Sequence, residues 1–124
     1  MKKTMICLLL MFVMAGCSDN VNQKAISDLT KNQTNEVTIV VFTNQLLENS
    51  FTREIQKNVD YINNNLRPDK PITNVSFIDI GNDKSYDYRH IFNLEDLPQI
   101  VLFEDKELVL KTDNPEDLVI HYEK

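Results

Sequence analysis

The chain has 124 residues, with 13 basic and 19 acidic side chains and a formal net charge of −6 at pH 7. This length predicts one small domain with a single core. The acidic balance and the lack of a basic cluster argue against nucleic-acid binding. The two glycines, Gly16 and Gly81, are too few for a glycine-rich nucleotide-binding loop.

Residues 1–16 have the order of a secretory signal peptide. Lys2 and Lys3 give a positive start, and an apolar run follows over Met5–Ala15. A membrane-spanning helix needs about twenty apolar residues, so this run is too short to be one. Cleavage would leave eleven basic and nineteen acidic residues, a net charge of −8.

The end of this run, Met14-Ala15-Gly16-Cys17, resembles a bacterial lipobox, with Met14 where leucine is more usual. The resemblance implies that Cys17 carries a lipid and becomes the mature N-terminus. The protein is then expected at the cell membrane, anchored on the extracytoplasmic side. The alternative is a soluble secreted protein cleaved near the same position. The other cysteine, Cys7, leaves with the signal, so the mature chain cannot form an internal disulfide.

Residues 17–36 are predicted to form a flexible tether, because they are rich in Asn, Gln, Ser, Thr and Lys and carry few apolar side chains. A coil of this length would hold the domain roughly 25 Å from the membrane. A short helix over Lys24–Leu29 is the competing prediction.

The folded domain is predicted over residues 37–124 and begins with a β-branched run, Val37–Phe42, typical of a strand buried on both faces. An amphipathic helix follows, with Asn49 or Ser50 as its N-cap and Pro68 ending it. Its apolar positions recur at helical spacing: Phe51, Ile55, Val59, Ile62 and Leu66. Val75–Ile80 is predicted as the second strand, followed by a turn at Gly81.

A short helix is expected within Ser85–Phe92. Gln99–Phe103 and Leu108–Lys111 then predict an antiparallel hairpin, and a last helix is expected after Pro115, capped by Asp113 or Asn114. The strands should supply the core, with side chains such as Val41, Phe77 and Val101.

The element order is thus β-α-β-α-β-β-α. Together with Leu97–Phe103 and its acidic turn, this order resembles the thioredoxin-like family over the whole of residues 37–124. The resemblance implies an α/β fold with a four-stranded mixed sheet flanked by helices, and a cis peptide bond before Pro98. In that family an extended polypeptide pairs with the backbone at this turn. The alternative is that Pro98 only begins a strand.

The chain departs from the family at the dithiol. Leu47 and Ser50 have the separation of the two family cysteines, and neither can act as a thiolate. The prediction is a redox-inactive domain whose groove still holds a protein or peptide by strand addition. Its candidate residues are Leu47, Ser50, Phe51, Leu97 and Pro98.

Other chemistry has weaker support. His90 follows three aspartates, but the spacing fits neither a zinc motif nor a calcium loop, so no metal and no cofactor are expected. Ser50 is expected as a helix cap rather than a nucleophile. Acidic residues near the hairpin form either a solvated rim or an attraction for a basic partner; they are Glu95, Asp96, Glu104, Asp105 and Glu107.

The leading hypothesis is therefore a membrane-anchored, redox-inactive, non-enzymatic module that binds an unidentified protein or peptide at the cell surface. A structural envelope-associated lipoprotein and an exported enzyme subunit with non-thiol chemistry are the alternatives. The enzyme hypothesis needs a pocket that gathers two or more titratable side chains.

Overall fold

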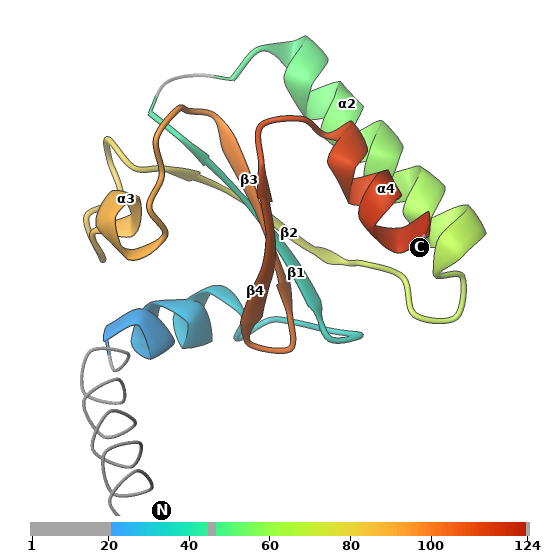
Figure 1. Ribbon diagram of the computed structural model, residues 1–124, viewed down its shortest axis with the longest axis horizontal. Helices are drawn as coiled ribbons and strands as arrows, with labels where there is room; N and C mark the ends of the chain where they lie inside the picture. Colours follow the sequence, from blue (N-terminus) through green and yellow to red (C-terminus); the bar gives the residue numbers. More distant parts are fainter. Residues whose placement is uncertain (1–20, 45–46, 124) are drawn as a thin grey trace, which may run out of the picture.

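The computed structural model describes residues 21–44 and 47–123. A four-stranded sheet lies at the centre, with two helices on one face and two further helical segments on the other (Figure 1). The elements in chain order are β1 (Val37–Thr43), α2 (Asn49–Tyr61), a π-helical turn η1 (Ile62–Leu66), β2 (Asn74–Asp79), α3 (Tyr88–Ile91), β3 (Gln99–Glu104), β4 (Glu107–Thr112) and α4 (Glu116–Glu123).

The sheet is mixed and has the order β2-β1-β3-β4. β1 runs parallel to β2, with Val40 opposite Ser76, and antiparallel to β3, with Val40 opposite Val101. β3 and β4 form an antiparallel hairpin with an irregularity at Leu102 and Phe103. The predicted order β-α-β-α-β-β-α and the mixed sheet are confirmed.

The two inner strands carry the core because both of their faces are covered. All seven residues of β1 are buried, as its run of β-branched side chains predicted. The core on the side of α2 and α4 (the α2-side core) contains Val37, Ile39, Val41, Ile55, Val59, Ile62, Ile72, Ile100, Leu102 and Leu118. The core on the opposite face (the α3-side core) contains Ala25, Val40, Phe42, Tyr88, Phe92, Leu94, Val101 and Phe103.

The prediction of a flexible tether is wrong for residues 21–36. Residues 21–29 are helical, Ala25 is fully buried, and Ile26 and Leu29 pack against the α3-side core. The physical reason is tertiary: a helix this short is marginal alone, but its few apolar side chains find a sheet face to cover. The competing prediction of a short helix over Lys24–Leu29 is confirmed, while residues 17–20 lie outside the described part.

Two local expectations are also corrected. The residue before α2 is Glu48, with no side-chain cap hydrogen bond, so neither Asn49 nor Ser50 is the N-cap. Phe77 is 45% exposed because β2 is an edge strand, so Phe77 is not a core residue. By contrast, Asn114 does cap α4: its Oδ1 accepts a hydrogen bond from the Glu116 N–H at 3.1 Å.

Within residues 21–44 and 47–123, no helix is both long and apolar enough to cross a membrane.

Candidate functional site

A groove lies at the end of the sheet where β1 ends and β3 begins. Its volume is about 360 Å³. The segment leading into α2 forms one wall, and the turn before β3 forms another. The residues that line it are Leu47, Glu48, Phe51, Asp96, Leu97, Pro98 and Asp113.

Four of the five predicted groove residues meet here. Leu47 and Phe51 pack against the α2-side core, whereas Leu97 packs against the α3-side core. The apolar floor is thus continuous with both cores, which hold it in place. The Leu97–Pro98 peptide bond is cis, as the resemblance implied. Ser50 does not line the groove; it is exposed, and its hydroxyl donates to Glu48 Oε2 at 3.5 Å.

The backbone at this turn is available for pairing. Among residues 21–44 and 47–123, no hydrogen bond involves the N–H or the C=O of Leu97. By contrast, the N–H groups of Phe51 and Thr52 at the neighbouring helix start are already paired, because both donate to the Glu48 carbonyl, at 3.1 and 3.2 Å. An extended chain lying along the groove could therefore pair with Leu97 as an added strand does.

The groove is also acidic. Three carboxylates line it, those of Glu48, Asp96 and Asp113, and none of the lining residues is basic. Glu48 and Asp113 were absent from the predicted site. They come from the segment before α2 and the segment after β4, so only the sheet order brings them to the turn. Asp96 precedes the predicted turn directly, which is a signal that sequence reasoning could have used.

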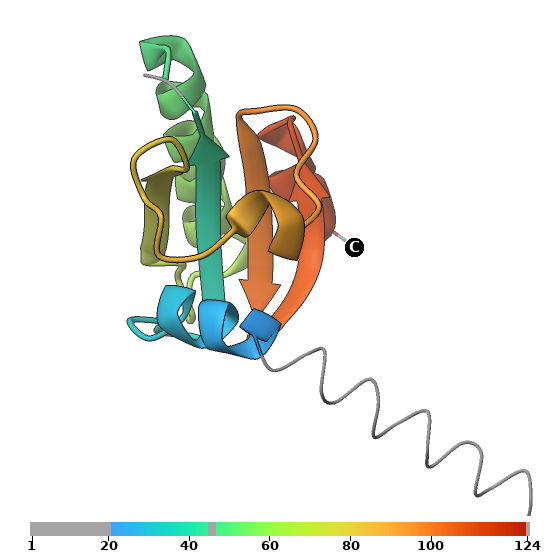
Figure 2. The same cartoon turned by 90° about the vertical axis from the view of Figure 1, so that its left-hand side faces the viewer.

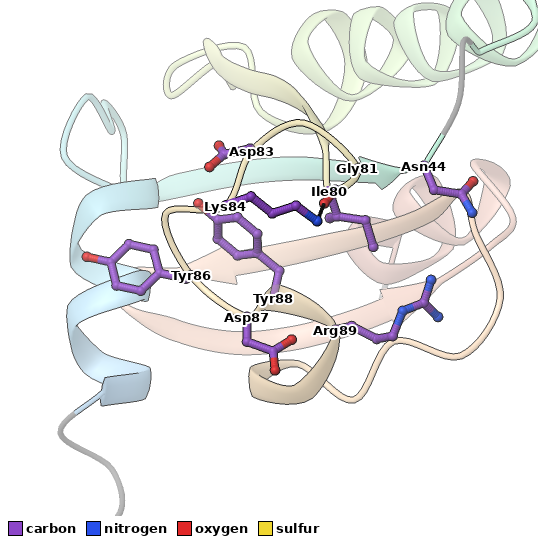
Figure 3. A pocket seen from close by; sticks show the side chains of 9 residues that line it. All are labelled: Asn44, Ile80, Gly81, Asp83, Lys84, Tyr86, Asp87, Tyr88 and Arg89. Atoms are coloured by element: carbon purple, nitrogen blue, oxygen red, sulfur yellow. Dashed lines mark hydrogen bonds between the residues drawn. The ribbon is translucent and has the colours of Figure 1, made fainter.

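A second hollow, of about 470 Å³, lies between the ends of β1 and β2 and the loop that carries α3 (Figure 3). Its two basic side chains donate hydrogen bonds to backbone carbonyls nearby in the sequence. Lys84 Nζ donates to the Ile80 carbonyl at 3.3 Å, and Arg89 Nη1 donates to the Glu95 carbonyl at 3.2 Å. Both signs of charge line it, so it has no clear preference for one class of ligand.

The aspartates near His90 stabilise turns. Asp79 accepts hydrogen bonds from the Gly81 N–H at 2.9 Å and from Asn82 Nδ2 at 3.0 Å. Asp83 accepts one from the Ser85 N–H at 3.0 Å. In the part of the chain that the structure describes, no group of three or more His, Cys, Asp or Glu side chains is placed to hold a metal ion.

The other histidine, His121, lies on α4. Its Nε2 is 3.2 Å from Glu104 Oε1. This pair joins α4 to the end of β3, away from the groove, and no serine hydroxyl takes part in it. The contact therefore serves packing between two elements.

No protein-family model matches the sequence, and no curated protein sequence matches it. Solved structures do share its fold. The match to the zinc-bound form of human ERp44 covers 79% of this chain and 29% of the ERp44 chain, with a TM-score of 0.54 and 13% identity. A thioredoxin from Fasciola hepatica matches over 78% of this chain and 90% of its own, with a TM-score of 0.51 and 15% identity. The match to a mutant thioredoxin from Halobacterium salinarum covers 79% of this chain and 80% of the thioredoxin chain, with a TM-score of 0.50 and 18% identity.

The chain therefore has a thioredoxin-like fold. Identities this low show the fold alone, and the chemistry of this protein has to be argued from its own residues.

Proposed function

We propose that this protein is a membrane-anchored, redox-inactive lipoprotein that binds an extended peptide segment of a partner protein in the groove at Leu97. The observation that carries the proposal is the Leu97 backbone, which has no hydrogen-bond partner among residues 21–44 and 47–123, beside an apolar floor of Leu47 and Phe51. Backbone pairing supplies affinity in strand addition, and the adjoining pocket supplies side-chain selectivity.

The lining chemistry specifies the peptide. An apolar side chain suits the floor, and the carboxylates of Glu48, Asp96 and Asp113 favour lysine or arginine at the neighbouring positions. A peptide that alternates apolar and basic side chains fits both features, because successive side chains of an extended strand point to opposite sides.

Redox inactivity follows from composition. The cysteines of the chain are Cys7 and Cys17, so residues 18–124 contain no sulfur nucleophile. Leu47 and Ser50 stand at the separation of the family dithiol, and neither can exchange disulfides.

Anchoring rests on the lipobox-like segment, Met14–Cys17, which lies outside the described residues. A lipid on Cys17 would place the groove at the extracytoplasmic surface, where it can meet other surface proteins. The alternative functions, a structural envelope lipoprotein or an exported enzyme subunit, draw no specific support from the geometry of the described part.

The test uses the mature chain from Cys17 and two fluorescent decapeptides, one alternating valine with lysine and one alternating valine with glutamate. Fluorescence anisotropy should show binding of the basic peptide, weakening as salt is added, and no binding of the acidic one. Leu47→Asn, which removes the apolar side chain without adding a charge, should abolish binding. The control is Ile120→Asp, which changes a 51% exposed side chain on α4 and should bind as the parent does.

A further variant separates charge from shape. Replacing Glu48, Asp96 and Asp113 by their amides keeps the side-chain volumes. The affinity for the basic peptide should fall by about tenfold or more, a modest value for three rim charges. If Leu47→Asn binds the basic peptide as tightly as the parent, the groove is not the binding site.

A further inference from the structure

The helical segment 21–29 is attached to the domain at several points. Ala25 is fully buried, and the Tyr86 hydroxyl donates a hydrogen bond to Asp28. At its end, Thr30 is 5% exposed, and its hydroxyl donates to the Ile26 carbonyl at 2.8 Å. The segment is thus a fixed part of the domain.

This segment lies at the end of the sheet opposite the groove. Gln23 and Ile26 line a hollow together with Lys106, which belongs to the turn between β3 and β4. Leu97 and Pro98 instead precede β3, at its other end. Figure 2 shows the blue helix below the start of β1, and both views show α2 beginning beyond the far end of β1 (Figures 1 and 2).

The length of chain between the lipobox cysteine and the helix is short. Cys17 and Val21 are four residues apart, and an extended chain spans at most about 3.6 Å per residue. Four residues therefore reach about 14 Å at most. A flexible tether over residues 17–36 would instead let the domain rotate freely and stand farther from the bilayer.

We propose that the docked helix fixes the orientation of the domain on the lipid surface. The end formed by helix 21–29 and the β3–β4 turn faces the bilayer, and the groove opens at the far end, toward the extracytoplasmic space. This inference rests on the proposed lipidation of Cys17. The six residues of β3 add about 20 Å between the two ends.

The charge of the groove end agrees with this orientation. The groove end carries the carboxylates of Glu48, Asp96 and Asp113 without a basic partner in the lining, so anionic headgroups would repel it. At the helix end, exposed Lys24 and Lys106 stand among exposed Asp28, Asp105 and Glu107, so this end carries both signs of charge.

The experiment uses two variants of the lipidated chain, each with one fluorophore at one end of the folded domain. Each variant is placed in phosphatidylcholine vesicles that contain an acceptor-labelled lipid. Residues 18–124 have no cysteine, so Lys106→Cys and Asp96→Cys each give one reactive thiol, both at exposed positions. Energy transfer to the bilayer should be about twofold or more higher from position 106, because about 20 Å separates the two ends. Equal transfer from both positions would overturn the proposal.

Two variants test the cause. Inserting a flexible ten-residue Gly-Ser linker between residues 20 and 21 leaves the fold untouched and should bring the two efficiencies together. Ala25→Arg should do the same by displacing the helix. A chain that does not float with vesicles overturns both the anchor and the orientation. Failure of the decapeptide to bind overturns the groove alone and leaves the transfer difference in place.

Discussion

The hydroxyl of Tyr86 donates a hydrogen bond to the carboxylate of Asp28, across 58 positions of sequence. The bond joins helix 21–29 to the loop before α3, and Figure 3 shows the Tyr86 ring extending toward that helix. The pKa of Tyr86 is raised, first because its hydroxyl bonds to Asp28 and then because of burial and the nearby negative charge. A segment that composition alone assigns to a tether is thus bonded to the domain at its surface.

Ala25→Arg tests whether this helix is docked. The Ala25 side chain is fully buried, so a long charged side chain cannot fit without moving the helix, and overpacking of this kind costs about 1–3 kcal/mol. We expect a lower urea midpoint and faster proteolysis within residues 21–36. Tyr86→Phe should show a smaller effect in the same direction.

The matched control is Lys24→Ala, one position earlier on the same helix and exposed. Its urea midpoint should equal that of the parent. Unchanged stability and unchanged proteolysis in Ala25→Arg would mean that the helix is not held against the α3-side core.

A pair of phenylalanines tests the assignment of core and edge. Phe103 is fully buried on β3, whereas Phe77 on edge strand β2 is 45% exposed. Phe103→Ala should lower the free energy of unfolding by about 3–5 kcal/mol, and Phe77→Ala by less than half of that. Denaturant unfolding of both variants provides the measurement, and equal losses would contradict the sheet order.

This contrast marks the limit of what the sequence could predict. The unbroken β-branched run of β1 predicted a strand buried on both faces, and the spacing from Phe51 to Leu66 predicted the long helix. Phe77 lies in the second predicted strand, and its exposure depends on the position of β2 in the sheet. Strand order is a tertiary property that hydrophobic pattern does not encode locally.

The same reason limits the site. Leu47, Phe51, Leu97 and Pro98 were predicted from resemblance and do line one groove. Asp113 was missed because it follows β4 and reaches the groove only through the hairpin. Helix 21–29 was underestimated because only four of its nine side chains are apolar, and the sheet face that three of them cover lies far away in sequence.

The absence of cysteine from residues 18–124 predicts that the mature chain has no disulfide reductase activity. The mature chain should reduce a model disulfide no faster than a boiled sample, because thiolate attack needs a cysteine. Leu47→Cys combined with Ser50→Cys restores the dithiol spacing at the start of α2 and serves as the comparison. Turnover by the parent above the boiled sample would contradict redox inactivity.

The proposed lipidation of Cys17 predicts that the Cys17→Ser precursor is not processed. A serine provides no sulfur for the thioether, so labelled lipid should not be incorporated, and the precursor should keep residues 1–16. Metabolic labelling and intact-mass measurement provide the readout. Ser18→Ala is the neighbouring control and should be processed like the parent; label on Cys17→Ser would exclude Cys17 as the lipidation site.

The raised pKa of Tyr122 predicts a loss of stability at alkaline pH. Its hydroxyl donates to Glu104 Oε2 at 3.4 Å, and burial, followed by the charge of Glu104, raises its pKa well above the ordinary value of 10.0. The folded state therefore holds this proton more tightly than the unfolded state does. The stabilisation is complete below pH 10 and is lost as pH rises above it.

Urea midpoints of the parent should fall from pH 9 to pH 11, and those of Tyr122→Phe should fall less. Some dependence should remain in that variant, because the pKa values of Tyr86 and Tyr88 are also raised. Tyr61→Phe, on the exposed side of α2, controls for the loss of a hydroxyl and should follow the parent. If Tyr122→Phe and the parent lose stability in parallel, the Tyr122 hydroxyl is not held by Glu104 in a buried site.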